Sequence, residues 1–158
     1  MISFHARPVP DQFWFAATAA QSDEQPEAAH GNPDLEVRSL RVLIVEDEFF
    51  ISLEMQNLLH GLGHVVVGIA VSADEAVRIA QSEQPDVAVV DIRLIGSRDG
   101  IEAAEEMFNR FGVPSLFVTA NTDPQTRGRA QAVHHLGFLE KPVNAQRLNL
   151  GLQNVPTR

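Results

Sequence analysis

Five polar side chains follow short apolar runs of the chain, and together they suit one kind of chemistry. Glu46 and Asp47 follow the run LRVLIV, Asp91 follows DVAVV, Thr119 ends PSLFVT, and Lys141 follows GFLE. Taken singly, each has an ordinary explanation, because carboxylates often cap helices and a lysine is most often solvated. Together, three carboxylates, a hydroxyl and an ammonium group are suited to binding a divalent cation and an oxyanion.

The elements that must position these residues can be read from the alternation of two patterns. Apolar runs near residues 40–45, 64–70, 86–92, 114–119 and 137–141 alternate with segments of helical periodicity. Polar caps mark the expected helix starts, namely Ser72, Asp99, Asp123 and Asn144. The central runs have no polar face, which is typical of a parallel sheet covered by helices on both sides. The sequence therefore predicts a doubly wound α/β domain.

In such a sheet the carboxyl ends of the strands converge on one crevice, where ligands bind. Two carboxylates about 4 Å apart repel each other by about 4 kcal/mol at an effective dielectric constant of 20. Glu46, Asp47 and Asp91 therefore require a compensating cation. With oxygen ligands and a phosphate as the companion, Mg²⁺ is favoured over Zn²⁺.

The strings LIVEDE, VVDIRL, FVTAN and FLEKPV, in this order, resemble the receiver domain of bacterial two-component response regulators over about residues 40–153. Intervals of 44, 28 and 22 residues separate Asp47, Asp91, Thr119 and Lys141. Each string alone is a weak signal, but the combination is specific. The resemblance implies a flavodoxin-like (βα)5 fold with strand order 2-1-3-4-5.

The resemblance also implies a role for each matching residue. Asp91 would be the phosphoacceptor, Thr119 would hydrogen-bond the phosphoryl group, and Lys141 would contact both the Asp91 carboxylate and a phosphoryl oxygen. Thr119 and Phe138 would form a switch, although many family members have tyrosine at the latter position and this chain contains none. Pro142 is expected to follow a cis peptide bond that directs Lys141, the only lysine beside eleven arginines, into the site.

For the metal, the resemblance implies that Asp47, Asp91 and the backbone carbonyl of Arg93 would hold Mg²⁺, with Glu46 acting through water. The histidines at 134–135 are expected to be solvated loop residues rather than metal ligands.

We expect a single-domain response regulator, because only 17 residues follow Lys141. A histidine kinase or phosphotransfer protein would phosphorylate this chain. The phosphorylated chain would then signal to a downstream protein by direct contact, or act as a phosphorelay intermediate or phosphate sink. The chain would not be an enzyme beyond its own phosphorylation and dephosphorylation. A receiver-like binding module that is never phosphorylated is the open alternative. A dinucleotide-binding domain is disfavoured because VEDE replaces a glycine-rich turn.

Composition limits the remaining classes of partner. A net charge of −9 argues against nucleic acid, no apolar run is long enough to cross a bilayer, and the absence of cysteine excludes disulfides and thiolate metal sites. We expect a cytoplasmic protein, and the sequence leaves open whether it forms a homodimer.

The predicted domain covers residues 40–158. Residues 1–39 form an acidic extension in which Asp11 could cap a short helix carrying Phe13, Trp14 and Phe15.

Overall fold

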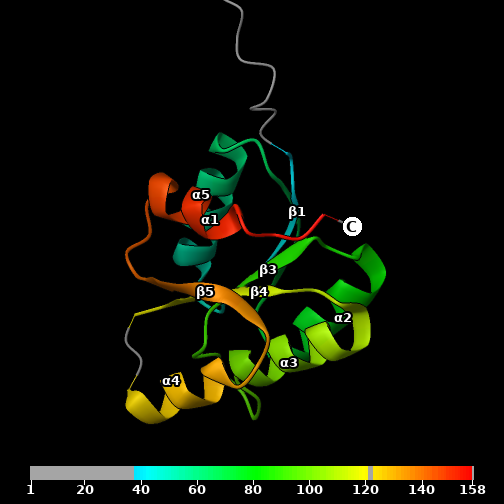
Figure 1. Cartoon of the computed structure of the whole chain (residues 1–158), viewed down its shortest axis with the longest axis vertical. Helices are drawn as coiled ribbons and strands as arrows, with labels where there is room; N and C mark the ends of the chain where they lie inside the picture. Colours follow the sequence, from blue (N-terminus) through cyan, green and yellow to red (C-terminus); the bar gives the residue numbers. More distant parts are fainter. Residues whose placement is uncertain (1–37, 121–122, 158) are drawn as a thin grey trace, which may run out of the picture. The chain divides into compact units, whose positions relative to one another are not determined.

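The computed structural model describes residues 38–120 and 123–157 and has five strands and five helices in strict alternation (Figure 1). The elements are β1 (Arg41–Val45), α1 (Phe49–Gly61), β2 (Val65–Ala70), α2 (Ala73–Glu83), β3 (Val87–Val90), α3 (Gly100–Phe111), β4 (Ser115–Thr119), α4 (Pro124–Gln131), β5 (His135–Glu140) and α5 (Ala145–Leu152). The expected 1–39 extension with its aromatic helix lies outside the described residues except for Arg38 and Ser39, and the boundary at residue 40 stays a prediction.

The five strands form one parallel sheet in the order β2-β1-β3-β4-β5, as predicted. Helices α1 and α5 lie on one face of the sheet, and α2 and α3 lie on the other (Figure 1). The strand order reverses direction at β1, since β2 lies on one side of it and β3 on the other. The carboxyl ends of β1 and β3 are therefore neighbours at the point where ligands bind in sheets of this kind.

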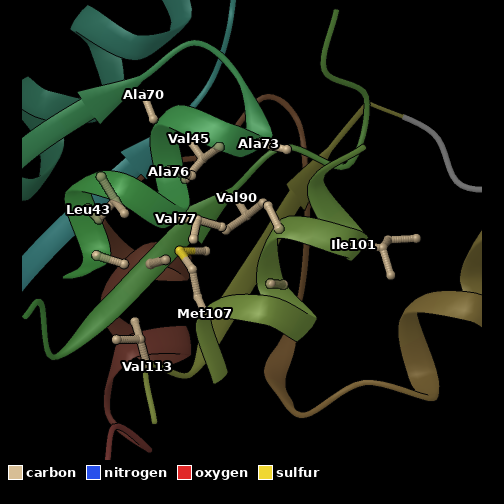
Figure 2. Packing of buried hydrophobic residues seen from close by; sticks show 14 of the residues in the cluster. Leu43, Val45, Ala70, Ala73, Ala76, Val77, Val90, Ile101, Met107 and Val113 are labelled. Carbon is tan, nitrogen blue, oxygen red and sulfur yellow. The ribbon is translucent and has the colours of Figure 1, made fainter. Parts of the chain in front are cut away.

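The side chains of each central strand alternate between two hydrophobic cores because successive residues point to opposite faces. Leu43 and Val45 of β1 pack with α2 and α3, as Figure 2 shows, whereas Val42 and Ile44 pack with α1 and α5. β3 alternates in the same way, so its four residues are all buried. This burial on both faces explains why β1 and β3 read as continuous apolar runs in the sequence.

Side-chain caps start four of the helices, as the sequence predicts, but one of them differs in detail. Asp99 forms a reciprocal capping box with Glu102 at the start of α3. At the start of α2, Ser72 accepts from the backbone N–H of Glu75, while the Glu75 carboxylate accepts from the N–H of Val71 instead of that of Ser72. Ser72 therefore caps α2, but the second contact of a capping box is absent there.

The packing around α3 and β5 differs in two places from what local sequence patterns predict. Periodicity predicts that Phe108 points into the core, but Met107 is fully buried and Phe108 is half-buried, stacked 4.0 Å from the ring of His134. His134 is exposed and precedes β5, as expected. The expectation was wrong for His135, which begins β5 and whose ring lies 4.7 Å from that of Phe138. Contacts with phenylalanine rings, stacked for His134 and tilted for His135, give these histidines partners that a local sequence pattern does not reveal.

Within the described ranges, no helix has both the length and the apolar character needed to cross a membrane. The expected cytoplasmic location stays a prediction.

Candidate functional site

The polar residues singled out in the sequence lie at the carboxyl ends of four strands. Asp91 directly follows β3, and its backbone N–H donates to the carbonyl of Val45 at the end of β1 (2.8 Å). The backbone N–H of Lys141, which directly follows β5, donates to the carbonyl of Thr119 at the end of β4 (3.0 Å). These ladder hydrogen bonds extend the sheet by one residue and fix the backbone beneath each functional side chain.

Lys141 joins two of the carboxylates at the floor of the crevice. Its Nζ donates to Glu46 Oε2 (2.7 Å) and to Asp91 Oδ2 (2.6 Å). The three side chains are 13%, 6% and 8% exposed, respectively, so the contacts are largely shielded from water. The second oxygen of Asp91 accepts from the backbone N–H of Arg93 (3.0 Å). The Asp91 carboxylate is thus held on both of its oxygens.

Burial shapes the protonation of this group. Desolvation raises the pKa of the Glu46 carboxyl above its ordinary value, and the hydrogen bond from Lys141 only partly offsets that effect. Burial alone would lower the pKa of Lys141, but its hydrogen bonds to Asp91 and Glu46 outweigh burial and raise it. Lys141 therefore stays cationic and supplies the positive charge that the buried carboxylates require.

Glu46, Asp47 and Asp91 each offer a carboxylate oxygen, and these oxygens all lie within 4.8 Å of one another. At that separation, two carboxylates repel by about 3 to 4 kcal/mol at an effective dielectric constant of 20. One ammonium group cannot neutralise three carboxylates. A cluster of hard oxygen donors fits Mg²⁺, so the donor set agrees with the cation inferred from the sequence. Arg93 lies at the same site, and its carbonyl as a ligand stays a prediction.

Thr119 brings a hydroxyl group without a partner to the same place. The residue is 5% exposed, and within the described part of the chain its Oγ1 is buried with no hydrogen bond. A buried hydroxyl without a partner carries a desolvation cost that a bound ligand would relieve. Thr119, Asp47, Asp91 and Lys141 all line one cavity of about 700 Å³.

The sequence reasoning missed the apolar wall and rim of this cavity. Ile51, Met55 and Leu58 of α1 form much of one side, and Ile95 from the β3–α3 loop lines it although that side chain is 80% exposed. Phe49 and Phe50, 70% and 82% exposed, lie between the lining residues Glu48 and Ile51. The sequence does show two consecutive phenylalanines directly after VEDE, where a helix starts at the predicted crevice. We call Phe49, Phe50 and Ile95 the apolar rim.

Phe138, the predicted switch residue, is half-buried in β5. Its ring stacks on that of Phe117, with 5.4 Å between the ring centroids, and also contacts His135. Pairing of Phe117 with Phe138 in the β4–β5 ladder brings the rings together. The peptide bond between Lys141 and Pro142 is cis, the isomer expected from the sequence. The switching role of Thr119 and Phe138 stays a prediction.

Comparisons with known proteins agree with this geometry. The family model described as the response regulator receiver domain matches residues 42–153. Among curated proteins, the phyllosphere-induced regulator PhyR of Methylorubrum extorquens is 40% identical over 80 residues, covering 50% of this chain and 30% of the relative. The transcriptional regulatory protein PdtaR of Mycobacterium tuberculosis is 34% identical over 104 residues, covering 66% and 50%. The chain thus spans half or less of these relatives.

A solved structure gives the same result for the fold. The signal receiver domain of a modulated diguanylate cyclase from Desulfovibrio desulfuricans G20 superposes with a TM-score of 0.72 at 36% identity, covering 75% of this chain and 94% of that one.

Removing the charge of Lys141 should leave the repulsion among the carboxylates uncompensated and so destabilise the folded state. We expect Lys141→Met to lower the free energy of unfolding by about 3 kcal/mol at pH 7 without divalent cations, because Glu46 and Asp91 lose their buried partner. Without Lys141 the pKa of Glu46 rises further, so the folded state binds more protons than the unfolded state as the pH falls toward 4.5. The difference in the free energy of unfolding between the wild type and Lys141→Met should therefore be smaller at pH 5 than at pH 7, as measured by urea denaturation.

Arg93→Met is the matched control, since it removes one positive charge from an exposed residue of the same cavity. Its effect should stay within about 0.5 kcal/mol at both pH values. Equal stability of Lys141→Met and the wild type at pH 7 would contradict this account of the site.

Proposed function

The chain belongs to the response regulator receiver domain family, and from this premise we propose that it accepts a phosphoryl group on Asp91 from a histidine kinase or phosphotransfer protein. The observation that carries the proposal is the pair of hydrogen bonds from Lys141 to Asp91 and Glu46 at the floor of a cavity. The same cavity holds the Thr119 hydroxyl, which has no partner among the described residues. A carboxylate beside a fixed cation and a free hydroxyl donor is suited to receiving a phosphoryl group.

The proposed transfer forms one bond and breaks another. An oxygen of the Asp91 carboxylate attacks the phosphorus atom of a phosphohistidine, and the phosphorus–nitrogen bond breaks with its electrons going to the imidazole nitrogen. Asp91 then carries an acyl phosphate, and a carboxylate nucleophile needs no base to remove a proton from it. The side chain is oriented in advance by Lys141 and the N–H of Arg93.

The surrounding groups would stabilise the new charge. Lys141 has a compact ammonium group that can release Asp91 Oδ2 and donate to a phosphoryl oxygen without leaving Glu46, whereas a planar guanidinium would fit this contact less well. The Thr119 hydroxyl can donate to a second phosphoryl oxygen. Mg²⁺ held by Glu46, Asp47, Asp91 and the carbonyl of Arg93 would neutralise phosphoryl charge.

The direct test uses a small phosphodonor, so that no cognate kinase needs to be known. Incubation of the purified chain with acetyl phosphate and Mg²⁺ should add the mass of one phosphoryl group, measured by intact-protein mass spectrometry. Asp91→Asn should abolish the adduct, whereas the control Asp74→Asn, at a carboxylate 80% exposed on α2, should retain it.

Chelation of Mg²⁺ with EDTA should also suppress the adduct. An adduct that persists in Asp91→Asn would refute Asp91 as the acceptor. The absence of an adduct from acetyl phosphate and from every histidine kinase tested would favour the alternative, a receiver-like module that binds proteins without phosphorylation.

The apolar rim supports a second part of the proposal, the contact with the phosphodonor protein. The phosphohistidine must enter the cavity above Asp91, so the protein that carries it must cover the cavity mouth. Ile95 lines the cavity and Phe50 immediately precedes the lining residue Ile51 in the sequence, and each of these two residues is more than three quarters exposed to solvent. Large exposed apolar groups beside a reactive cavity are typical of a protein-binding surface. The downstream target and a homodimer stay predictions.

Replacing one rim residue should separate protein docking from chemistry. The test uses a histidine kinase that phosphorylates the wild type, with the chain at limiting concentration. Phe50→Ala should lower the rate of phosphoryl transfer from this kinase about tenfold, because a well-buried aromatic contact is lost. The rate with acetyl phosphate should not change, because Phe50 lies outside the group that holds Asp91. Val65→Ala, at an exposed residue at the amino end of β2, is the control. A parallel loss with both donors would contradict the docking role.

A further inference from the structure

Helix α4 has little apolar contact with the rest of the domain. Ala130 is its buried residue, and the other residues of this eight-residue helix are exposed or half-exposed. Its sequence, PQTRGRAQ, contains an interior glycine, which disfavours a helix relative to alanine by about 1 kcal/mol. One buried methyl group provides a weak attachment, so the position of α4 must depend on other contacts.

An ion pair supplies such a contact. Arg129 Nη1 of α4 lies 2.7 Å from Oδ2 of Asp99, the N-cap of α3. The other oxygen of Asp99 accepts from the backbone N–H groups of Ile101 (3.1 Å) and Glu102 (3.0 Å). The carboxylate is therefore already fixed by the cap, and forming the ion pair with Arg129 requires no further ordering of Asp99.

The two partners of the ion pair connect to the two halves of the phosphorylation site. Asp99 precedes Gly100, whose N–H donates to the carbonyl of Ile92 (2.9 Å) and whose Cα lies so close to the Asp91 carbonyl that a side chain would clash with it. On the other side, Asp123 caps α4 four residues after Thr119. Helix α4 is thus linked covalently to Thr119 and by charge to the segment that carries Asp91.

We propose that the Asp99–Arg129 ion pair is a tether that holds α4 in its resting position and opposes the movement of Thr119 toward a phosphoryl group on Asp91. The proposal rests on the proposed function. The Thr119 hydroxyl has no partner in the described structure, so a phosphoryl group would attract it. Because Asp123, the cap of α4, follows Thr119 by four residues, a movement of Thr119 requires α4 to shift, and α4 can shift only when Arg129 leaves Asp99.

Breaking the tether should therefore favour phosphorylation. We expect Arg129→Gln to raise the rate of phosphorylation by acetyl phosphate two- to fivefold, roughly the equilibrium shift from losing one partly exposed ion pair. Asp99→Asn should give a similar increase, because asparagine also caps helices but carries no charge. The double variant should gain no more than either single variant, since both changes remove the same interaction.

Arg127→Gln is the matched control on the same helix. Arg127 is exposed, and among the described residues it forms no ion pair, yet its replacement changes the net charge by the same amount. Its phosphorylation rate should match that of the wild type. Rising salt should narrow the difference between the wild type and Arg129→Gln, because exposed charges are screened.

Hydrogen exchange measured without a phosphodonor tests the tether separately. The α4 amides should exchange faster in Arg129→Gln than in Arg127→Gln. Equal exchange in these two variants, or an equal rise in their phosphorylation rates, would overturn the proposal. If the wild type accepts no phosphoryl group, the proposed function fails, and the exchange comparison alone decides whether Arg129 holds the helix.

Discussion

The structure depends on the need to hold three carboxylates within a few ångströms of one another at the end of a buried sheet. Carboxylate oxygens of Glu46, Asp47 and Asp91 lie within 4.8 Å of one another, and the ammonium group of Lys141 compensates their mutual repulsion only in part. Clustered anions are unfavourable for an isolated domain but favourable for a domain that binds a cation. The site is thus organised around charge that a ligand is needed to neutralise.

The fold brings these charges together by strand order. β1 and β3 are neighbours in the centre of the sheet, so residues that are 45 positions apart, Glu46 and Asp91, follow adjacent strand ends. β5 lies at the edge and is separated from β1 by β3 and β4, and the long side chain of Lys141 reaches back from it to Glu46. Gly100 adds a further constraint, because the first turn of α3 packs directly on the Asp91 carbonyl. Asp91 is therefore held from the sheet side and the helix side.

Much of this arrangement was predictable because its signals are local. Continuous apolar runs reveal buried parallel strands, polar caps reveal helix starts, and the residues after strand ends reveal the crevice. Contacts between distant residues were less accessible. The pairing of Arg129 with Asp99 joins residues 30 positions apart, and no spacing rule indicates it. The hydrogen bond between Lys141 and Glu46, the exposed Ile95 at the cavity and the burial of Met107 in place of Phe108 likewise depend on how the packed elements meet.

The most direct test of the central claim is a crystal structure of the chain with Mg²⁺ and beryllium trifluoride, a stable analogue of a phosphoryl group. The account predicts the analogue on an Asp91 carboxylate oxygen, the cation among Glu46, Asp47 and Asp91, Lys141 Nζ in contact with a fluorine atom, and the Thr119 hydroxyl donating to another. An analogue bound elsewhere, or a Lys141 Nζ that makes no contact with the analogue at saturating analogue and Mg²⁺, would contradict it.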